Sequence, residues 1–203
     1  ETPIRHVNTT VEELINRIQE VIDGRDYEMQ EVLDDYLNYC YHDSLIPVSD
    51  GWKFMRVQLA GTTFDFNVRE NLYYDSIDRG FRAHRYLGLY KNKSVQAVGE
   101  VIAIITGTQD QNGTLMYRAE QGELTEERKK AIERAILDSK QYGYELVSTR
   151  FFFVKQFYKT DFRKSTPRAP MGTRIFDLTT VLGTTEIPDA QQLAQILAQK
   201  TWE

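Results

Sequence analysis

The chain has 203 residues, 41% hydrophobic and 27% charged, a composition that excludes a disordered or low-complexity protein. No stretch approaches the roughly 20 consecutive apolar residues that a membrane helix needs, and the single cysteine, Cys40, excludes an internal disulfide and favours a reducing cytoplasm. Taken as an average, the formal net charge of −5 argues against a protein that binds nucleic acid.

The first 50 residues predict two helices. Thr10 and Glu13 have the spacing of a capping box, and apolar residues then recur at helical spacing until Gly24. Residues 27–41 repeat this pattern, with acidic residues on the opposite face. We expect residues 1–50 to form an antiparallel helical pair that packs on the rest of the chain in one compact unit.

After this segment the pattern changes to strands. Residues 52–60 and 62–68 alternate in polarity on either side of Gly61, which predicts a hairpin. Residues 69–83 carry charges, two tyrosines and Gly80, and predict a loop or a short helix of functional importance.

Residues 85–90 and 95–105 predict a second hairpin around a polar Lys-Asn-Lys-Ser turn. The order of elements predicts an α+β fold, in which residues 51–203 form a sheet domain with peripheral helices. The other expected elements are a short strand at 115–118, a helix at 125–141, a long strand at 144–158, a last strand at 173–178 and a helix at 189–200.

Basic residues are concentrated between positions 150 and 174. This stretch has seven positive residues and one negative residue, Asp161, so its net charge is +6 and the rest of the chain sums to −11. Lysine and arginine neutralise phosphates, and the phenylalanines and tyrosine among them offer stacking surface. A solvated strand face above a buried aromatic face is the alternative. The basic residues are Arg150, Lys155, Lys159, Arg163, Lys164, Arg168 and Arg174.

A second basic cluster contains Arg79, Arg82, His84 and Arg85. Arginines in bidentate geometry would make it a phosphate clamp. Surface ion pairs with the neighbouring acidic residues, Asp75, Asp78 and Glu70, are the alternative that we favour slightly.

The segment FRAHRYLGLYKNKSVQAVGEV, residues 81–101, resembles the central hairpin of PUA-like β-barrels, the superfamily that includes the ASCH, EVE and YTH groups. Residues 162–178, with Pro167, Gly172 and the sequence RIFDL, look like the loop and closing strand of similar domains in prokaryotic restriction and defence proteins. The resemblance implies a PUA-like barrel or a strongly curved mixed sheet.

The resemblance also implies binding of RNA or DNA, in some members by holding a flipped, modified base in an aromatic pocket. A flipped base needs aromatic rings for its two faces and polar groups for its edge. Simple packing of tyrosines in the sheet is the alternative, and it is the more common one. The candidates for such a pocket are Tyr73, Tyr74, Tyr86 and Tyr90, with His84 or Asp75 at the edge of the base.

Evidence for catalysis is weaker. Asp65 and Glu100, if they lie on neighbouring strands, are a pair of carboxylates that could hold a divalent metal. The restriction-nuclease pattern also requires a lysine two residues after the second acid, and here that residue is Ile102. Cys40 lies on the apolar face of a predicted helix, which favours inert packing over nucleophilic catalysis. We expect no cofactor and no metal.

The sequence therefore predicts a nucleic-acid-binding module, a reader of modified or flipped bases in a prokaryotic defence or restriction system, with DNA and RNA both open as partners. The alternatives are a protein-interaction or oligomerisation module built on the acidic helical pair, and a metal-dependent nuclease. A homodimer and an attached effector domain are further partners to consider, whereas a membrane is not.

Overall fold

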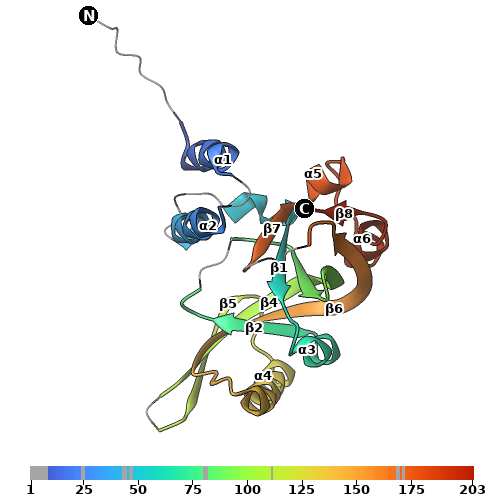
Figure 1. Ribbon diagram of the computed structural model, residues 1–203. Helices are drawn as coiled ribbons and strands as arrows, with labels where there is room; N and C mark the ends of the chain where they lie inside the picture. The colour runs from blue at the N-terminus through green and yellow to red at the C-terminus, as the bar shows by residue number, and fades with distance from the viewer. Residues whose placement is uncertain are drawn as a thin grey trace, which may run out of the picture. The chain divides into compact units, whose positions relative to one another are not determined.

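The computed structural model describes residues 9–23, 26–42, 45, 48–79, 82–110, 112–167, 170 and 172–203. The chain divides into two units (Figure 1). Glu1–Asp50 and Gly80–Ala83 form the first, called here the helical unit, and Gly51–Arg79 and His84–Glu203 form the second, the sheet unit. None of the helices in the described part of the chain is long and apolar enough to cross a membrane.

The described part of the helical unit contains two α-helices, as the sequence predicts: α1 (Val11–Val21) and α2 (Tyr27–His42). At the start of α1, the Thr10 hydroxyl accepts a hydrogen bond from the Glu13 amide, and the Glu13 carboxylate accepts one from the Thr10 amide. This confirms the capping box, which satisfies two amides that a helix end leaves without partners. Ile15, Leu33 and Cys40 form the buried seam between the helices.

An eight-stranded mixed sheet is the framework of the second unit. Six strands follow the order β2-β6-β4-β3-β1-β7, while β5 pairs with β4 and β8 pairs with β6. The β1–β3 and β6–β8 pairs are parallel and the others are antiparallel. The strands are β1 (Phe54–Leu59), β2 (Leu72–Ser76), β3 (Tyr86–Lys91), β4 (Ser94–Gln109), β5 (Leu115–Gln121), β6 (Ser148–Lys164), β7 (Arg174–Asp177) and β8 (Thr201–Trp202).

This sheet is strongly curved. Three strands separate β1 from β2, which in a flat sheet would place them about 19 Å apart. Nevertheless Arg56 Nη2 on β1 lies 3.3 Å from Asp75 Oδ2 on β2. Two such side chains together reach only about 10 Å, so the sheet must bend until its inner face brings β1 and β2 together. The end strands β2 and β7 do not pair with each other, and the sheet stays open.

Among the described residues from Val48 onward, four α-helices and two short 3-10 helices accompany the strands. In Figure 1, α3 and α4 lie near β2, whereas α5 and α6 lie near β7 and β8. Ala131, Ile132 and Ala135 of α4 form one apolar cluster with β4 and β6, and Leu193 and Leu197 of α6 form another with β1, β3 and β4. The helices are α3 (Phe64–Glu70), α4 (Glu126–Ser139), α5 (Leu178–Leu182), α6 (Ala190–Leu197), η1 (Val48–Lys53) and η2 (Lys140–Tyr142).

The α+β class is confirmed, together with the second hairpin, β3–β4, and the helices predicted at 125–141 and 189–200. The long strand predicted at 144–158 begins later and continues to Lys164, and β8 was not predicted.

One predicted hairpin is wrong. Residues 62–68 were expected as a strand, but the segment forms α3, which ends where Asn71 adopts the left-handed conformation (φ 53°). Asn67 is fully buried and donates a hydrogen bond to the Leu72 carbonyl at 2.9 Å. This bond links the helix to β2, a strand within the segment that was predicted as a loop or short helix.

A test of this packing compares two glycines with left-handed backbones. A Cβ at Gly122 (φ +69°) would lie 2.5 Å from the Ile102 carbonyl oxygen, whereas one at Gly113 (φ +80°) would meet open space. We expect Gly113→Ala to cost about 1 kcal/mol of unfolding free energy and Gly122→Ala about 3 kcal/mol, measured by urea unfolding. Equal losses would contradict the close approach of Gly122 to β4.

Candidate nucleic-acid interface

The basic residues predicted to contact nucleic acid are distributed over β6 and β7. Lys155, Lys159 and Arg163 are exposed on β6, and Lys164 and Arg174 are half-buried. Arg168 lies outside the described residues. From Lys155 to Lys164 the strand extends over up to about 30 Å, so the exposed cations form a row and not a single cluster.

Two cations of the stretch are neutralised by acids. Arg150 is 9% exposed, and its guanidinium makes two bonds to the Glu120 carboxylate, at 2.8 and 3.2 Å. Arg163 pairs with Asp161 at 2.7 Å. The Ser94 hydroxyl also donates to Asp161, and these two bonds lower the pKa of that carboxyl. Arg150 is therefore structural, and the positive charge left on the surface is smaller than the sequence suggested.

Lys164 and Arg174 form a cationic pair beside an aromatic ring. Lys164 Nζ lies 5.2 Å from the centre of the Trp202 ring, and Lys164 and Trp202 are register partners on β6 and β8. Burial lowers the pKa of Lys164, and the positive charge of Arg174 lowers it further. The charge of Glu203 acts on this pKa in the opposite direction and offsets part of the positive potential.

The acidic excess of the chain belongs to the helical unit. This unit holds four of the 25 basic residues and twelve of the 30 acidic residues, so its net charge is −8. The sheet unit holds the other 21 basic and 18 acidic residues, so its net charge is +3. The unit that carries β6 is therefore cationic by itself, and the chain's net charge of −5 is no argument against its binding an anion.

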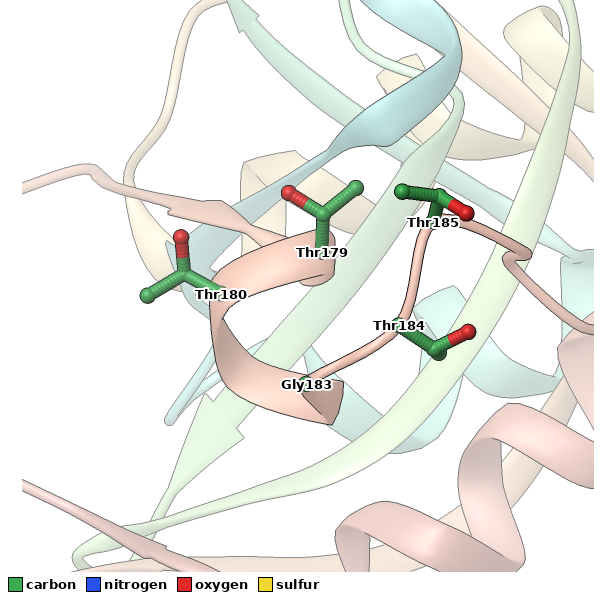
Figure 2. A pocket seen from close by; sticks show the side chains of 5 residues that line it. All are labelled: Thr179, Thr180, Gly183, Thr184 and Thr185. Carbon is green, nitrogen blue, oxygen red and sulfur yellow. The ribbon is translucent and has the colours of Figure 1, made fainter.

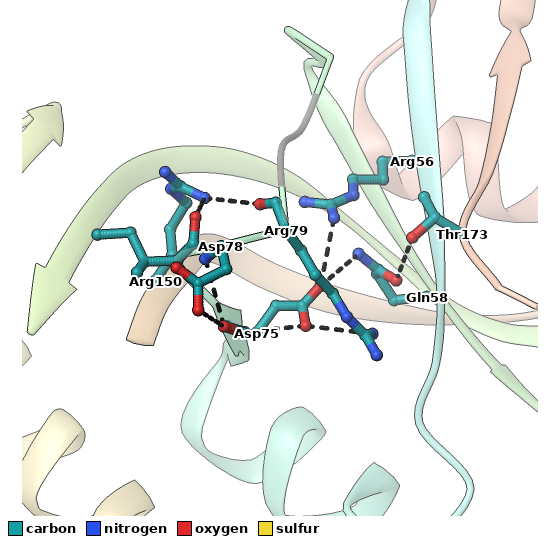
Figure 3. A network of polar contacts seen from close by, with 9 residues as sticks. Arg56, Gln58, Asp75, Asp78, Arg79, Arg150 and Thr173 are labelled. Atoms are coloured by element: carbon teal, nitrogen blue, oxygen red, sulfur yellow. Dashed lines mark hydrogen bonds and ion pairs between the residues drawn. The ribbon is translucent and has the colours of Figure 1, made fainter. Parts of the chain in front are cut away.

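A buried polar cluster lies on the inner face of the curved sheet (Figure 3). Asp75 is at its centre: its carboxylate pairs with Arg56 at 3.3 Å and with Arg79 at 3.4 Å. Gln58 lies between Arg56 and Thr173. Its amide oxygen accepts from Arg56 Nε at 2.7 Å and its nitrogen donates to Thr173 Oγ1 at 2.9 Å, because the opposite orientation would bring two N–H donors together.

Aromatic rings surround this cluster. The Arg56 guanidinium lies 5.1 Å from the centre of the Phe152 ring, and the His84 ring lies 5.6 Å from the same ring. Burial lowers the pKa of Arg56 to about 10, while the charge of Asp75 acts in the opposite direction. Arg56 thus stays charged at neutral pH. A guanidinium, a carboxylate, an amide and an imidazole among aromatic rings are groups that can bind the edge of a planar heterocycle.

The six residues predicted for a base pocket do not gather in one place. Tyr73 and Asp75 on β2, and His84, lie with the buried polar cluster. Tyr74 instead packs with Phe151 in the apolar cluster of α4.

The other two predicted tyrosines belong to the apolar cluster of α6. Tyr86 is fully buried, and its hydroxyl donates to the Pro188 carbonyl at 2.6 Å. Tyr90 packs against Trp202 with ring centres 6.0 Å apart. Both tyrosines are therefore placed as core residues of the sheet unit.

Sequence reasoning missed four members of the cluster: Arg56, Gln58, Phe152 and Thr173. Arg56 and Gln58 alternate with apolar residues along β1, which for an ordinary sheet predicts a solvated face. The contact with β2 that buries them comes from the curvature of the sheet, and no local pattern in the sequence signals it.

Two residues of the second basic cluster have acidic partners within the sheet unit. Arg79 pairs with Asp75, and Arg85 pairs with Glu100 at 2.7 Å. Arg82 belongs to the helical unit. For Arg79, the structure therefore agrees with the alternative of an ion pair with a neighbouring acidic residue.

The carboxylates suggested for a nuclease are held apart. Asp65 lies on α3, not on a strand, with its side chain 90% exposed and 3.8 Å from Lys91. Glu100 pairs with Arg85 near the opposite end of β3, about 17 Å along the strand. Among the described residues, no group of three or more His, Cys, Asp or Glu side chains is placed to hold a metal ion.

A shallow depression of about 550 Å³ lies at the end of α5 (Figure 2). Its lining consists of Gly183 and four threonines, Thr179, Thr180, Thr184 and Thr185. It offers hydroxyl groups but neither a charge nor an aromatic ring, so it provides little to recognise a particular ligand.

Comparisons with known proteins return no match: no family model, no curated protein and no solved structure is similar to this chain. The resemblance to PUA-like domains therefore stays a prediction from the motif residues. The open, curved mixed sheet is compatible with it.

We expect Asp75→Asn to cost about 3 kcal/mol of unfolding free energy, because it leaves the buried Arg56 guanidinium without its carboxylate. Glu100→Gln, which removes a carboxylate from the more exposed pair with Arg85, should cost less than about 1 kcal/mol. Chemical unfolding of both variants measures the difference. A small loss for Asp75→Asn would show that the buried pair does not hold β1 and β2 together.

Proposed function

We propose that the sheet unit binds nucleic acid along β6, with DNA and RNA as the two candidate classes. The observation that carries the proposal is the row of exposed cations on one strand of a net cationic unit. Lys155 and Lys159 have no ion-pair partner among the described residues, and the half-buried Lys164 continues the row at the end of the strand, beside Trp202. Cations in such a row bind phosphates by releasing counterions, and an aromatic ring next to them can stack on a base.

We propose further that the buried polar cluster recognises a base that is flipped out of its stack. Tyr73 supplies a ring, while Asp75, Gln58 and His84 supply donors and acceptors for the edge of a base. Phe152, fully buried against Arg56 and His84, supports the cluster from below. Arg56 and Thr173 would act as positioning residues, since they fix the carboxylate of Asp75 and the amide of Gln58.

Recognition of modified bases fits a role in a prokaryotic defence or restriction system, and this role is part of the same proposal. It is supported by the resemblance of residues 81–101 and 162–178 to PUA-like domains of such systems. Cys40, a free and buried thiol, is compatible with a cytoplasmic location.

Replacing Lys155 and Lys159 with alanine tests the first part. We expect the double variant to bind duplex DNA or RNA roughly ten- to a hundred-fold more weakly at low salt, and the slope of log K against log salt to fall by about 2. Fluorescence anisotropy with single- and double-stranded oligonucleotides measures both quantities.

Lys130→Ala with Lys140→Ala is the matched control, because it removes the same charge from exposed positions of α4 and η2. It should change affinity less than two-fold. Equal effects of the two double variants would mean that only the total charge matters, and this result would contradict a binding surface on β6.

His84→Phe tests the second part, because phenylalanine keeps a ring against Phe152 but removes both ring nitrogens. We expect it to reduce the preference for one modified base over its unmodified form by about ten-fold, while the salt slope stays unchanged. A panel of oligonucleotides with single modified bases measures this preference. The proposal fails if the folded wild-type protein binds all members of the panel equally.

A further inference from the structure

The helical unit has an exposed apolar face in addition to its buried seam. On α1, Leu14, Ile18 and Val21 are exposed, Val21 by 85%. On α2, Met29, Val32 and Tyr36 are exposed as well, with Val32 at 62%. None of the six belongs to the seam formed by Ile15, Leu33 and Cys40.

These residues lie on the same side of the helical pair. At about 100° per residue, the exposed apolar residues of α1 lie roughly 60° to one side of its buried row. On α2 the exposed apolar residues are displaced by a similar angle from Leu33 and Cys40. The short connection between Val21 and Tyr27 makes the two helices antiparallel. In antiparallel helices these two displacements point to the same side, so the six residues form one continuous face.

The area of this face matches what a stable dimer needs. The exposed parts of the six residues amount to on the order of 600 Å² in one copy, or about 1,200 Å² in a pair, the lower end of the range for specific interfaces. A patch of this size is at the upper end of the range for the largest apolar patch on a monomer. Two antiparallel helices also enclose too little core for an independent unit, whereas two such pairs make a four-helix bundle.

The charges at the rim of the face also favour a second copy. Arg17 is the only lysine or arginine within α1 and α2; it pairs with the exposed Glu20 at 3.1 Å and lies on the outer edge of the apolar residues of α1. The outer edge of the face on α2 carries Glu28 and Asp35. In a two-fold dimer, α1 of one copy can lie against α2 of the other. Arg17 of each copy then faces the acidic edge of its partner, so the contact occurs two times.

We infer that the chain forms a two-fold homodimer in which the apolar faces of two helical units meet as a four-helix bundle. The net charge of −8 on each helical unit opposes this association. Salt screens the repulsion, so dimerisation strengthens with salt. This dependence is opposite in sign to that of nucleic-acid binding, and the two properties can be tested separately on the same preparation.

Sedimentation velocity on the full chain at 50 and 500 mM NaCl, from 1 to 100 μM, tests the inference. We expect the wild type to shift from the monomer mass to the dimer mass within this range, at lower concentration in the higher salt. Val32→Asp should weaken dimerisation at least ten-fold. Leu137→Asp, which places the same charge at an exposed apolar position of α4 in the sheet unit, should weaken it less than two-fold.

Circular dichroism of Val32→Asp checks that its helices remain, and Val21→Lys provides a second variant of opposite charge with the same expected loss. A wild type that stays monomeric at 100 μM in both salts would overturn the inference. A dimer that survives both substitutions with intact helices would also overturn it, because the contact would then lie elsewhere.

Discussion

The contact between Arg56 and Asp75 is the interaction on which the shape of the sheet unit depends. It joins two strands that the hydrogen-bond order separates by three others, and so it requires the sheet to bend. A buried ion pair contributes little net stability, but the loss of either partner leaves an uncompensated charge. The pair thus favours the curvature that brings β1 and β2 together over a flatter sheet. The same bend places Tyr73, His84 and Phe152 around the polar groups.

The two units carry net charges of opposite sign, so the net charge of the whole chain describes neither of them. The whole chain is acidic, yet the sheet unit is cationic and the helical unit holds the acidic excess. Each unit then has a surface that suits a different ligand: exposed cations along β6 for phosphates, and an apolar face on α1 and α2 for a second copy.

Local patterns in the sequence predicted the elements whose signals are local. The capping box of Thr10 and Glu13 and the Lys-Asn-Lys-Ser turn each depend on residues close in sequence. The strand predicted for the segment that forms α3 was wrong, because its alternation of apolar residues fits a strand as well as a short helix. The decisive contact, Asn67 with the Leu72 carbonyl, follows from the helix end at Asn71.

The candidate site was predicted only in part, because contacts between distant strands leave no local pattern in the sequence. Tyr73, Asp75 and His84 were identified from residue type, but Arg56 and Gln58 were missed, because their burial results from a contact between distant strands. The charge of the basic stretch was overestimated because the pairing of Arg150 with Glu120 is also a contact between strands.

The most direct test of the central claim maps the ligand onto the sheet. Backbone amide shifts of the isotope-labelled protein, recorded while a short oligonucleotide is added at low salt, should change along 155–164 and at Trp202. Shifts confined to other strands, or the absence of any shift at saturating oligonucleotide, would contradict a nucleic-acid surface on β6.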